Sequence, residues 1–172
     1  MKPDPSAGPG SGPSAARRRG TESREGNSRE SSRDSFPHIR PIQTRWHDND
    51  AYGHVNNVVY YAWFDTVINL WLIEQGGLDI GTSPVIGVCA ESHCAYREAF
   101  AFPEAVEAGL RVAELGRTSV RYEIGLFKEG ADEAAASGWF VHVFVDRESG
   151  RPTEPPARLR EALDRLLVPP AA

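Results

Sequence analysis

The chain has 172 residues, of which 40% are hydrophobic and 25% charged, and its formal net charge is -5. This length suits one domain with a core of its own, and the composition is that of an ordinary globular protein. The acidic balance argues against a nucleic-acid-binding surface, and no stretch reaches the ~18 apolar residues that a membrane span needs.

Residues 1–36 form a segment of different composition, dominated by Gly, Pro, Ser, Arg and Glu. Because large apolar side chains are almost absent from it, the segment cannot bury enough surface to offset the entropy lost on ordering. We therefore predict a disordered tail over 1–36 and a folded domain over 37–168.

Two features predict a cytoplasmic location. The arginines at 17–19 are not followed by an apolar run, so they do not begin a signal peptide. The two cysteines, Cys89 and Cys94, lie on one predicted strand, and alternation along a strand would place them on opposite faces. A disulfide between them is therefore not expected, which suits a reducing compartment.

The first predicted strand covers residues 39–46, where apolar and polar residues alternate. Pro41 lies within this strand and favours a position at the edge of a sheet, because proline cannot donate to a neighbouring strand. A polar loop over 48–56 follows the strand.

Residues 57–75 predict a helix that is apolar around most of its circumference, with only a narrow polar stripe at Asp65, Thr66 and Asn69. Such a helix is expected to be buried in a globular protein. Asn56 is suited to cap its start, and Gly76 and Gly77 are suited to end it.

Four further strands are predicted, separated by turn-forming residues, and a short amphipathic helix follows Pro155 and Pro156. The strand ranges are 84–98, 105–114, 118–128 and 135–147. This order predicts an α+β fold in which a curved antiparallel sheet covers one central helix.

The loop before the helix carries the residues with chemical potential. Two carboxylates, an imidazole and two amides lie within residues 48–57. The start of a helix offers unpaired N–H groups that can stabilise an oxyanion. A nearby carboxylate could attack a carbonyl carbon or deprotonate a water molecule, and Gly53 would allow close approach of a ligand. These parts would suffice for acyl transfer to water.

This stretch also resembles the active site of a known family. It reads Trp46, Asp48, Asp50, Gly53, His54-Val55-Asn56-Asn57 and Tyr60. Over about 39–147 the chain resembles the hotdog-fold thioesterases of the 4-hydroxybenzoyl-CoA thioesterase type. The resemblance implies a curved antiparallel β-sheet around a central α-helix, hydrolysis of acyl-CoA without a metal or organic cofactor, and a homodimer or homotetramer with sites at subunit interfaces.

The resemblance assigns roles to individual residues. Asp50 matches the catalytic carboxylate, either as a nucleophile that forms a mixed anhydride or as a general base. His54 and Asn56 match orienting groups of the catalytic site. The residues that match the substrate-binding part, including backbone amides for the thioester oxygen, are Gly53, Asn57, Val58 and Tyr60.

Simpler interpretations stand beside these. Asp50 could instead cap a loop turn, and His54 and Asn56 could only stabilise the loop. Three other functions remain open: hydrolysis of thioesters on acyl-carrier protein, hydration of enoyl-CoA, and acyl-CoA binding without catalysis. The histidines and cysteines lack the spacing of a zinc site, and the identity of the acyl group is left undetermined.

Overall fold

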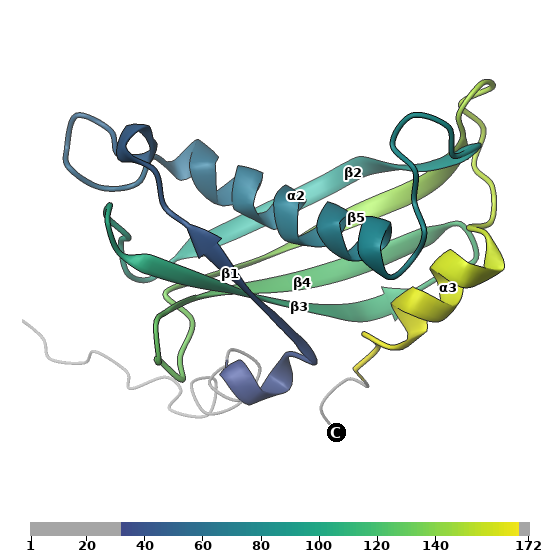
Figure 1. Cartoon of the computed structure of the whole chain (residues 1–172). Helices are drawn as coiled ribbons and strands as arrows, with labels where there is room; N and C mark the ends of the chain where they lie inside the picture. The colour runs from purple at the N-terminus through teal and green to yellow at the C-terminus, as the bar shows by residue number, and fades with distance from the viewer. Residues whose placement is uncertain (1–31, 169–172) are drawn as a thin grey trace, which may run out of the picture.

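The computed structural model describes residues 32–168, shown in Figure 1. Most of the predicted tail, 1–31, lies outside these residues. Its last part is described: Arg33–Ser35 forms a 3-10 helix, η1, and Phe36 is buried. Residues 32–36 therefore belong to the packed part of the chain, ahead of the boundary expected at 37.

A single antiparallel sheet forms the body of the molecule. Its spatial order is β1-β3-β4-β5-β2, so the two ends of the sheet are β1 and β2. Each strand coincides with a predicted one to within a few residues, and β1, which contains Pro41, is an edge strand as expected. The strand bounds are β1 His38–Gln43, β2 Val85–Tyr96, β3 Ala105–Leu115, β4 Ser119–Lys128 and β5 Ala136–Asp146.

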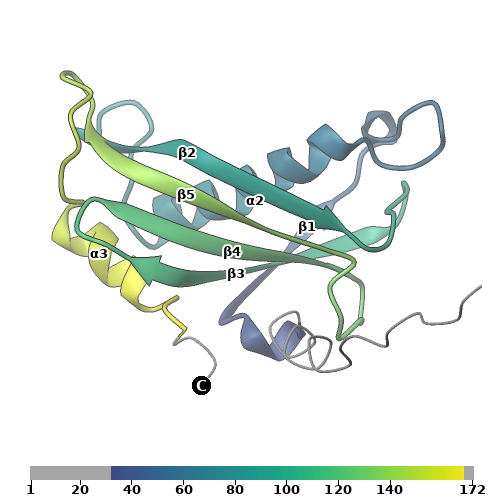
Figure 2. The ribbon, with the colours of Figure 1, turned by 180° about the vertical axis from the view of Figure 1, so that it is seen from behind.

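The long helix α2, Asn57–Glu74, lies across the concave face of this sheet (Figures 1 and 2). Its buried side chains are Tyr60, Trp63, Phe64, Val67, Ile68 and Leu72. The short helix α3, Ala157–Asp164, packs at one end of the sheet (Figure 1). This is the predicted hotdog arrangement of the α+β class. Within residues 32–168, no helix is both long and apolar enough to cross a membrane.

The sheet covers α2 on one side only. Asp65 and Thr66 of the polar stripe are exposed, and the apolar residues Leu70 and Ile73 beside it are only half-buried. The single chain therefore covers only part of the apolar surface of α2. The uncovered part lies on the side of α2 next to edge strand β2.

Phe36, near the start of the folded domain, packs into a notch on the convex face of the sheet. Gly109 of β3 and Gly125 of β4 are paired in register, and the ring of Phe36 lies over both. A Cβ atom on Gly109 would come within 2.7 Å of the Phe36 ring, and one on Gly125 within 3.0 Å. The missing side chains thus create the space that Phe36 fills.

The two cysteines lie on the same face of β2, not on opposite faces as expected, because the strand contains a β-bulge. In β2, Cys89 is opposite His142 and Cys94 is opposite Gly138 of β5, with a register shift between Cys89 and Glu91. His142 and Gly138 are four residues apart and so share a face of β5. The extra residue in the bulge therefore brings both cysteines to the concave face, and both thiols are free.

Candidate active site

The predicted loop is held by an ion pair whose carboxylate is buried. The Asp48 side chain is 0% exposed and accepts hydrogen bonds from the Arg45 guanidinium at 2.8 and 3.0 Å and from the Arg45 amide at 2.7 Å. Burial raises the pKa of the Asp48 carboxyl, but the hydrogen bonds from Arg45 outweigh it and hold the pKa below its ordinary value. Asp48 is thereby occupied in fixing the loop.

Beyond Asp48 the chain makes a tight turn closed by a bridge between Asn49 and Val55. Gly53 adopts a φ of 83°, a conformation that glycine tolerates far better than other residues. The half-buried Asp50 lies in this turn, and its Oδ1 accepts the Tyr52 amide at 2.8 Å. No donor within residues 32–168 bonds to its other oxygen, Oδ2, so the turn uses one oxygen and leaves the second available.

The first amides of α2 differ in their hydrogen bonding. The Asn56 side chain accepts the Val58 amide at 3.1 Å, which makes Asn56 the predicted N-cap, and the Asn56 carbonyl accepts the Val59 amide at 2.9 Å. No acceptor for the Asn57 amide is found among residues 32–168. Of the amides expected over 57–60 to hold an oxyanion, those of Val58 and Val59 are therefore occupied, and that of Asn57, the first residue of the helix, is the candidate donor.

Asp50 and Asn57 line the same cavity, of about 290 Å³. Two other lining residues, Val55 and Tyr60, also come from the predicted loop and helix. The remaining lining residues come from the end of β2 and the segment after it: Tyr96, Arg97, Glu98 and Ala99. These four residues are distant from the loop in the sequence, so no local pattern identifies them. Only the fold brings the end of β2 beside the start of α2.

Two tyrosines fix this wall of the cavity. The buried Tyr60 hydroxyl accepts the Phe100 amide at 3.2 Å, and burial raises the pKa of Tyr60. The Tyr96 hydroxyl donates to the Asn57 carbonyl at 3.4 Å, and its ring packs edge-on against Tyr60 with centroids 5.0 Å apart. Tyr60 therefore acts as a structural anchor, and Tyr96 ties the end of β2 to the first residue of α2.

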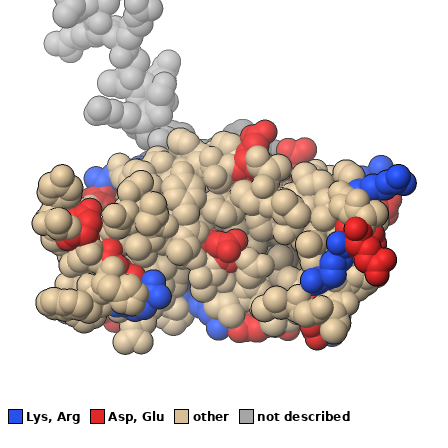
Figure 3. All heavy atoms as spheres, turned by 90° about the horizontal axis from the view of Figure 1, so that it is seen from above, with Lys and Arg blue, Asp and Glu red and all other residues tan. Residues whose placement is uncertain are grey.

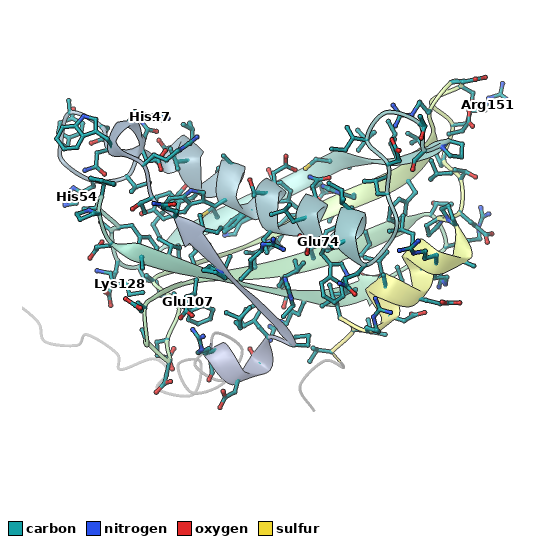
Figure 4. The ribbon with its side chains drawn as sticks, viewed as in Figure 1. His47, His54, Glu74, Glu107, Lys128 and Arg151 are labelled. Carbon is teal, nitrogen blue, oxygen red and sulfur yellow. The ribbon has the colours of Figure 1, made fainter. Side chains whose placement is uncertain are left out.

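The other predicted site residues are not gathered around the cavity. His54, Gly53 and Val58 are exposed, and they do not line it. Figure 4 shows His54 on the outer side of the loop, away from α2. Asn56 caps the helix start with its side chain, and its amide donates to the Asp48 carbonyl at 2.9 Å. Within residues 32–168, no group of three or more His, Cys, Asp or Glu side chains is placed to hold a metal ion.

Comparison with known proteins identifies the family. Residues 44–163 match the family model described as the thioesterase-like superfamily. A comparison with curated protein sequences gave no match. Among solved structures, the PA5185 protein from Pseudomonas aeruginosa strain PAO1 is 57% identical with a TM-score of 0.78, and the match covers 79% of this chain and 95% of that protein.

Two further structures carry functional names. A thioesterase from Thermus thermophilus, solved in complex with coenzyme A and zinc, is 30% identical with a TM-score of 0.64, over 77% of this chain and 96% of that one. The BH1999 gentisyl-coenzyme A thioesterase is 23% identical with a TM-score of 0.65, over 73% of this chain and 99% of that one, and this likeness shows the fold alone. By its matching family model, its fold and these relatives, the chain belongs to the thioesterase-like superfamily of hotdog proteins.

Proposed function

We propose that the protein hydrolyses acyl-CoA thioesters to the free acid and coenzyme A, with Asp50 as the catalytic carboxylate. The observation that carries the proposal is that Asp50 and Asn57 line one cavity at the start of α2, and that the Asn57 amide has no acceptor among residues 32–168. A thioester oxygen held by the Asn57 amide would gain stabilisation as negative charge develops on it.

In the overall reaction one water molecule is consumed, the carbon–sulfur bond breaks, the acyl carbon gains an oxygen to become a carboxylate, and a proton passes to the leaving sulfur. Asp50 can take part in two ways. It can remove a proton from the attacking water, or its free oxygen can add to the carbon first and form an anhydride that water then opens. After a single turnover in heavy-oxygen water, label in the Asp50 carboxylate would demonstrate an anhydride that water opens at the Asp50 carbonyl, because general-base attack places the label only in the product acid.

Coenzyme A is the carrier favoured by the relatives, since the Thermus thermophilus protein was solved with coenzyme A bound. Arg97 is the cation in the cavity lining, beside the carboxylates of Asp50 and Glu98, and it could pair with an anionic group of the ester. Hydrolysis of thioesters on acyl-carrier protein would use the same carboxylate and amide, so it is the second candidate.

We also propose that the protein works as a homodimer, or as a tetramer built from such dimers, joined through β2. The free edge of β2 is long and contains no Pro, Lys or Arg, the usual features that protect an edge strand from pairing. Val88 and Tyr96 on this strand are each 47% exposed. Most of the face that carries α2 and β2 is uncharged, with acidic atoms near its centre (Figure 3), and a largely uncharged face suits burial against a second copy.

The function is tested by incubating the protein with a panel of acyl-CoA esters, the matching acyl-carrier-protein esters and crotonyl-CoA, and following thiol release and hydration separately. Thiol release from acyl-CoA at rates above those from the carrier protein supports the proposal. Faster release from the carrier protein would change the assigned carrier. Hydration without thiol release would make the protein an enoyl-CoA hydratase, and tight binding without either reaction would make it a binding domain.

A further inference from the structure

The loop that carries Asp50 is tethered on both sides of this residue to one distant part of the chain. Before Asp50, the side-chain oxygen of Asn49 accepts the Phe102 amide at 3.0 Å. After it, the Val55 amide donates to the Phe100 carbonyl at 2.8 Å. Both phenylalanines belong to the connection between β2 and β3. Asp50 therefore lies in a short span whose two ends are bonded to the same connection.

Asn49 also makes contacts within the loop. Its Nδ2 donates to the Gly53 carbonyl at 3.4 Å, and the residue pairs with Val55 in the bridge that closes the turn. Residues 51–54 are all exposed, so packing does little to hold them. Exposed loops with few buried contacts are the most mobile parts of a fold. The hydrogen bonds of Asn49 therefore determine how closely the Asp50 carboxylate keeps its place.

The connection that receives these bonds, residues 97–104, is itself held by the core. Phe100 is 0% exposed, and its amide donates to the buried Tyr60 hydroxyl at 3.2 Å. At the other end of the connection, the Glu104 carbonyl accepts the hydroxyl of the buried Thr44 at 2.8 Å. The tether of Asn49 thus runs to a fixed point of the structure.

The same connection forms one wall of the cavity in the candidate site. Arg97, Glu98 and Ala99 line this cavity together with Asp50. Asn49 is not part of the lining, so its effect on a reaction there would pass through the neighbouring carboxylate. A displacement of about 1 Å in a reacting group can lower a rate by about a hundredfold, so a tether one residue away bears directly on the chemistry.

We infer that Asn49 is a positioning residue for the proposed hydrolysis and that its bond to Phe102 holds the Asp50 carboxylate in place. The Asn57 amide is fixed by the helix that it begins, so the carboxylate is the partner that needs a tether. The inference rests on the proposed function and adds to it a residue that does not touch the substrate.

The first test measures thiol release from an acyl-CoA ester by Asn49→Ala. We expect kcat to fall by at least about tenfold, because the carboxylate is less well placed, while KM stays within about twofold of the wild-type value. If Asn49→Ala does not fold, Asn49→Ser takes its place, since the shorter side chain also loses the bond to Phe102.

The second test repeats the substitution in an Asp50→Asn background. If Asn49 acts through the carboxylate, removing its side chain should change the remaining thiol release by less than about twofold once the carboxylate is gone. A loss that reflects only fewer folded molecules would persist in both backgrounds. Tenfold losses in both would therefore overturn the inference.

Asn69→Ala is the matched control. Asn69 is also half-buried and its Nδ2 donates to the Asp65 carbonyl at 2.9 Å, but it does not line the cavity. This variant should keep the wild-type kcat and KM, and thermal unfolding checks that every variant folds. A folded Asn49→Ala protein with the wild-type kcat would overturn the inference and leave the proposed hydrolysis intact. Absence of thiol release by the wild type from every ester would overturn both.

Discussion

The side-chain oxygen of Asn56 accepts the amide of Val58 at 3.1 Å, so one residue both caps α2 and removes Val58 as an oxyanion donor. The amide of Asn57, between them, stays available. The helix start is thereby divided into a structural part and a part that can bind a ligand.

Replacing the cap should destabilise the fold by a predictable amount. Asn56→Ala is expected to lower the free energy of unfolding by about 1 kcal/mol, the usual cost of a lost N-cap. Asn56→Ser keeps an acceptor and should stay close to the wild type. Urea unfolding measures both, and an unchanged midpoint in Asn56→Ala would show that the cap does not stabilise the helix.

The ion pair of Asp48 with Arg45 should make stability depend on pH. The pKa of the folded-state carboxyl lies below its ordinary value of 3.8. Its contribution to stability is therefore complete above that value and is lost as the pH falls through the folded-state pKa. At neutral pH, Asp48→Asn should lower the free energy of unfolding by ~1.5–3 kcal/mol, because it removes charged hydrogen bonds to a buried group.

The comparison across pH is the decisive part of that prediction. Chemical unfolding of the wild type and Asp48→Asn, from neutral pH down to below the ordinary carboxyl range, should show the difference shrinking as Asp48 of the wild type takes up a proton. A difference that stays constant over the whole range would mean that the charge of Asp48 contributes nothing.

The notch that holds Phe36 predicts a coupled pair of substitutions. Gly109→Ala should cost ~1–3 kcal/mol of unfolding free energy, because its Cβ overlaps the Phe36 ring at 2.7 Å. In a Phe36→Ala background the ring is gone, and the same change should cost much less. Equal costs in both backgrounds, measured by urea unfolding, would show that Phe36 does not occupy the notch in solution.

Much of the fold follows from local patterns. The alternation in β4 and the all-round apolar face of α2 predict these elements closely, because each pattern reports burial directly. The role of the paired glycines at 109 and 125 could not be predicted. Nothing in the sequence around a strand glycine indicates that a distant ring, here that of Phe36, packs against it. The bulge after Cys89 could not be predicted either. One extra residue moves the side chains that follow it to the other face of the strand and leaves no mark in the composition.

The candidate site, like the fold, was only partly predictable from the sequence. Asp50, Asn56 and Asn57 lie within one short segment, so a pattern of residue types can find them. Tyr96 and Ala99 line the cavity only because β2 is paired with β5 at the sheet edge, and that pairing joins residues distant in the chain. His54 shows the opposite limit: it fits the pattern, but it is exposed and does not line the cavity.

Assembly through β2 gives a prediction for quaternary structure. Val88→Glu puts a new negative charge on the free edge near Glu91, where pairing of β2 with a second copy would bury it. We expect the variant to sediment as a monomer with strongly reduced thioester hydrolysis. Val88→Thr keeps the β-branched shape without charge and should remain a dimer. A wild-type protein that sediments as a monomer and is fully active would contradict the proposed assembly.

The most direct measurement of the central claim is thiol release by Asp50→Asn under conditions where the wild type is active. Asparagine keeps the oxygen that accepts the Tyr52 amide at 2.8 Å, so the turn is preserved while the carboxylate is lost. We predict a fall in kcat of at least about a hundredfold, the scale of a removed catalytic acid or base, with an unfolding midpoint close to that of the wild type. A variant that folds normally and releases thiol at the wild-type rate would contradict the assignment of Asp50.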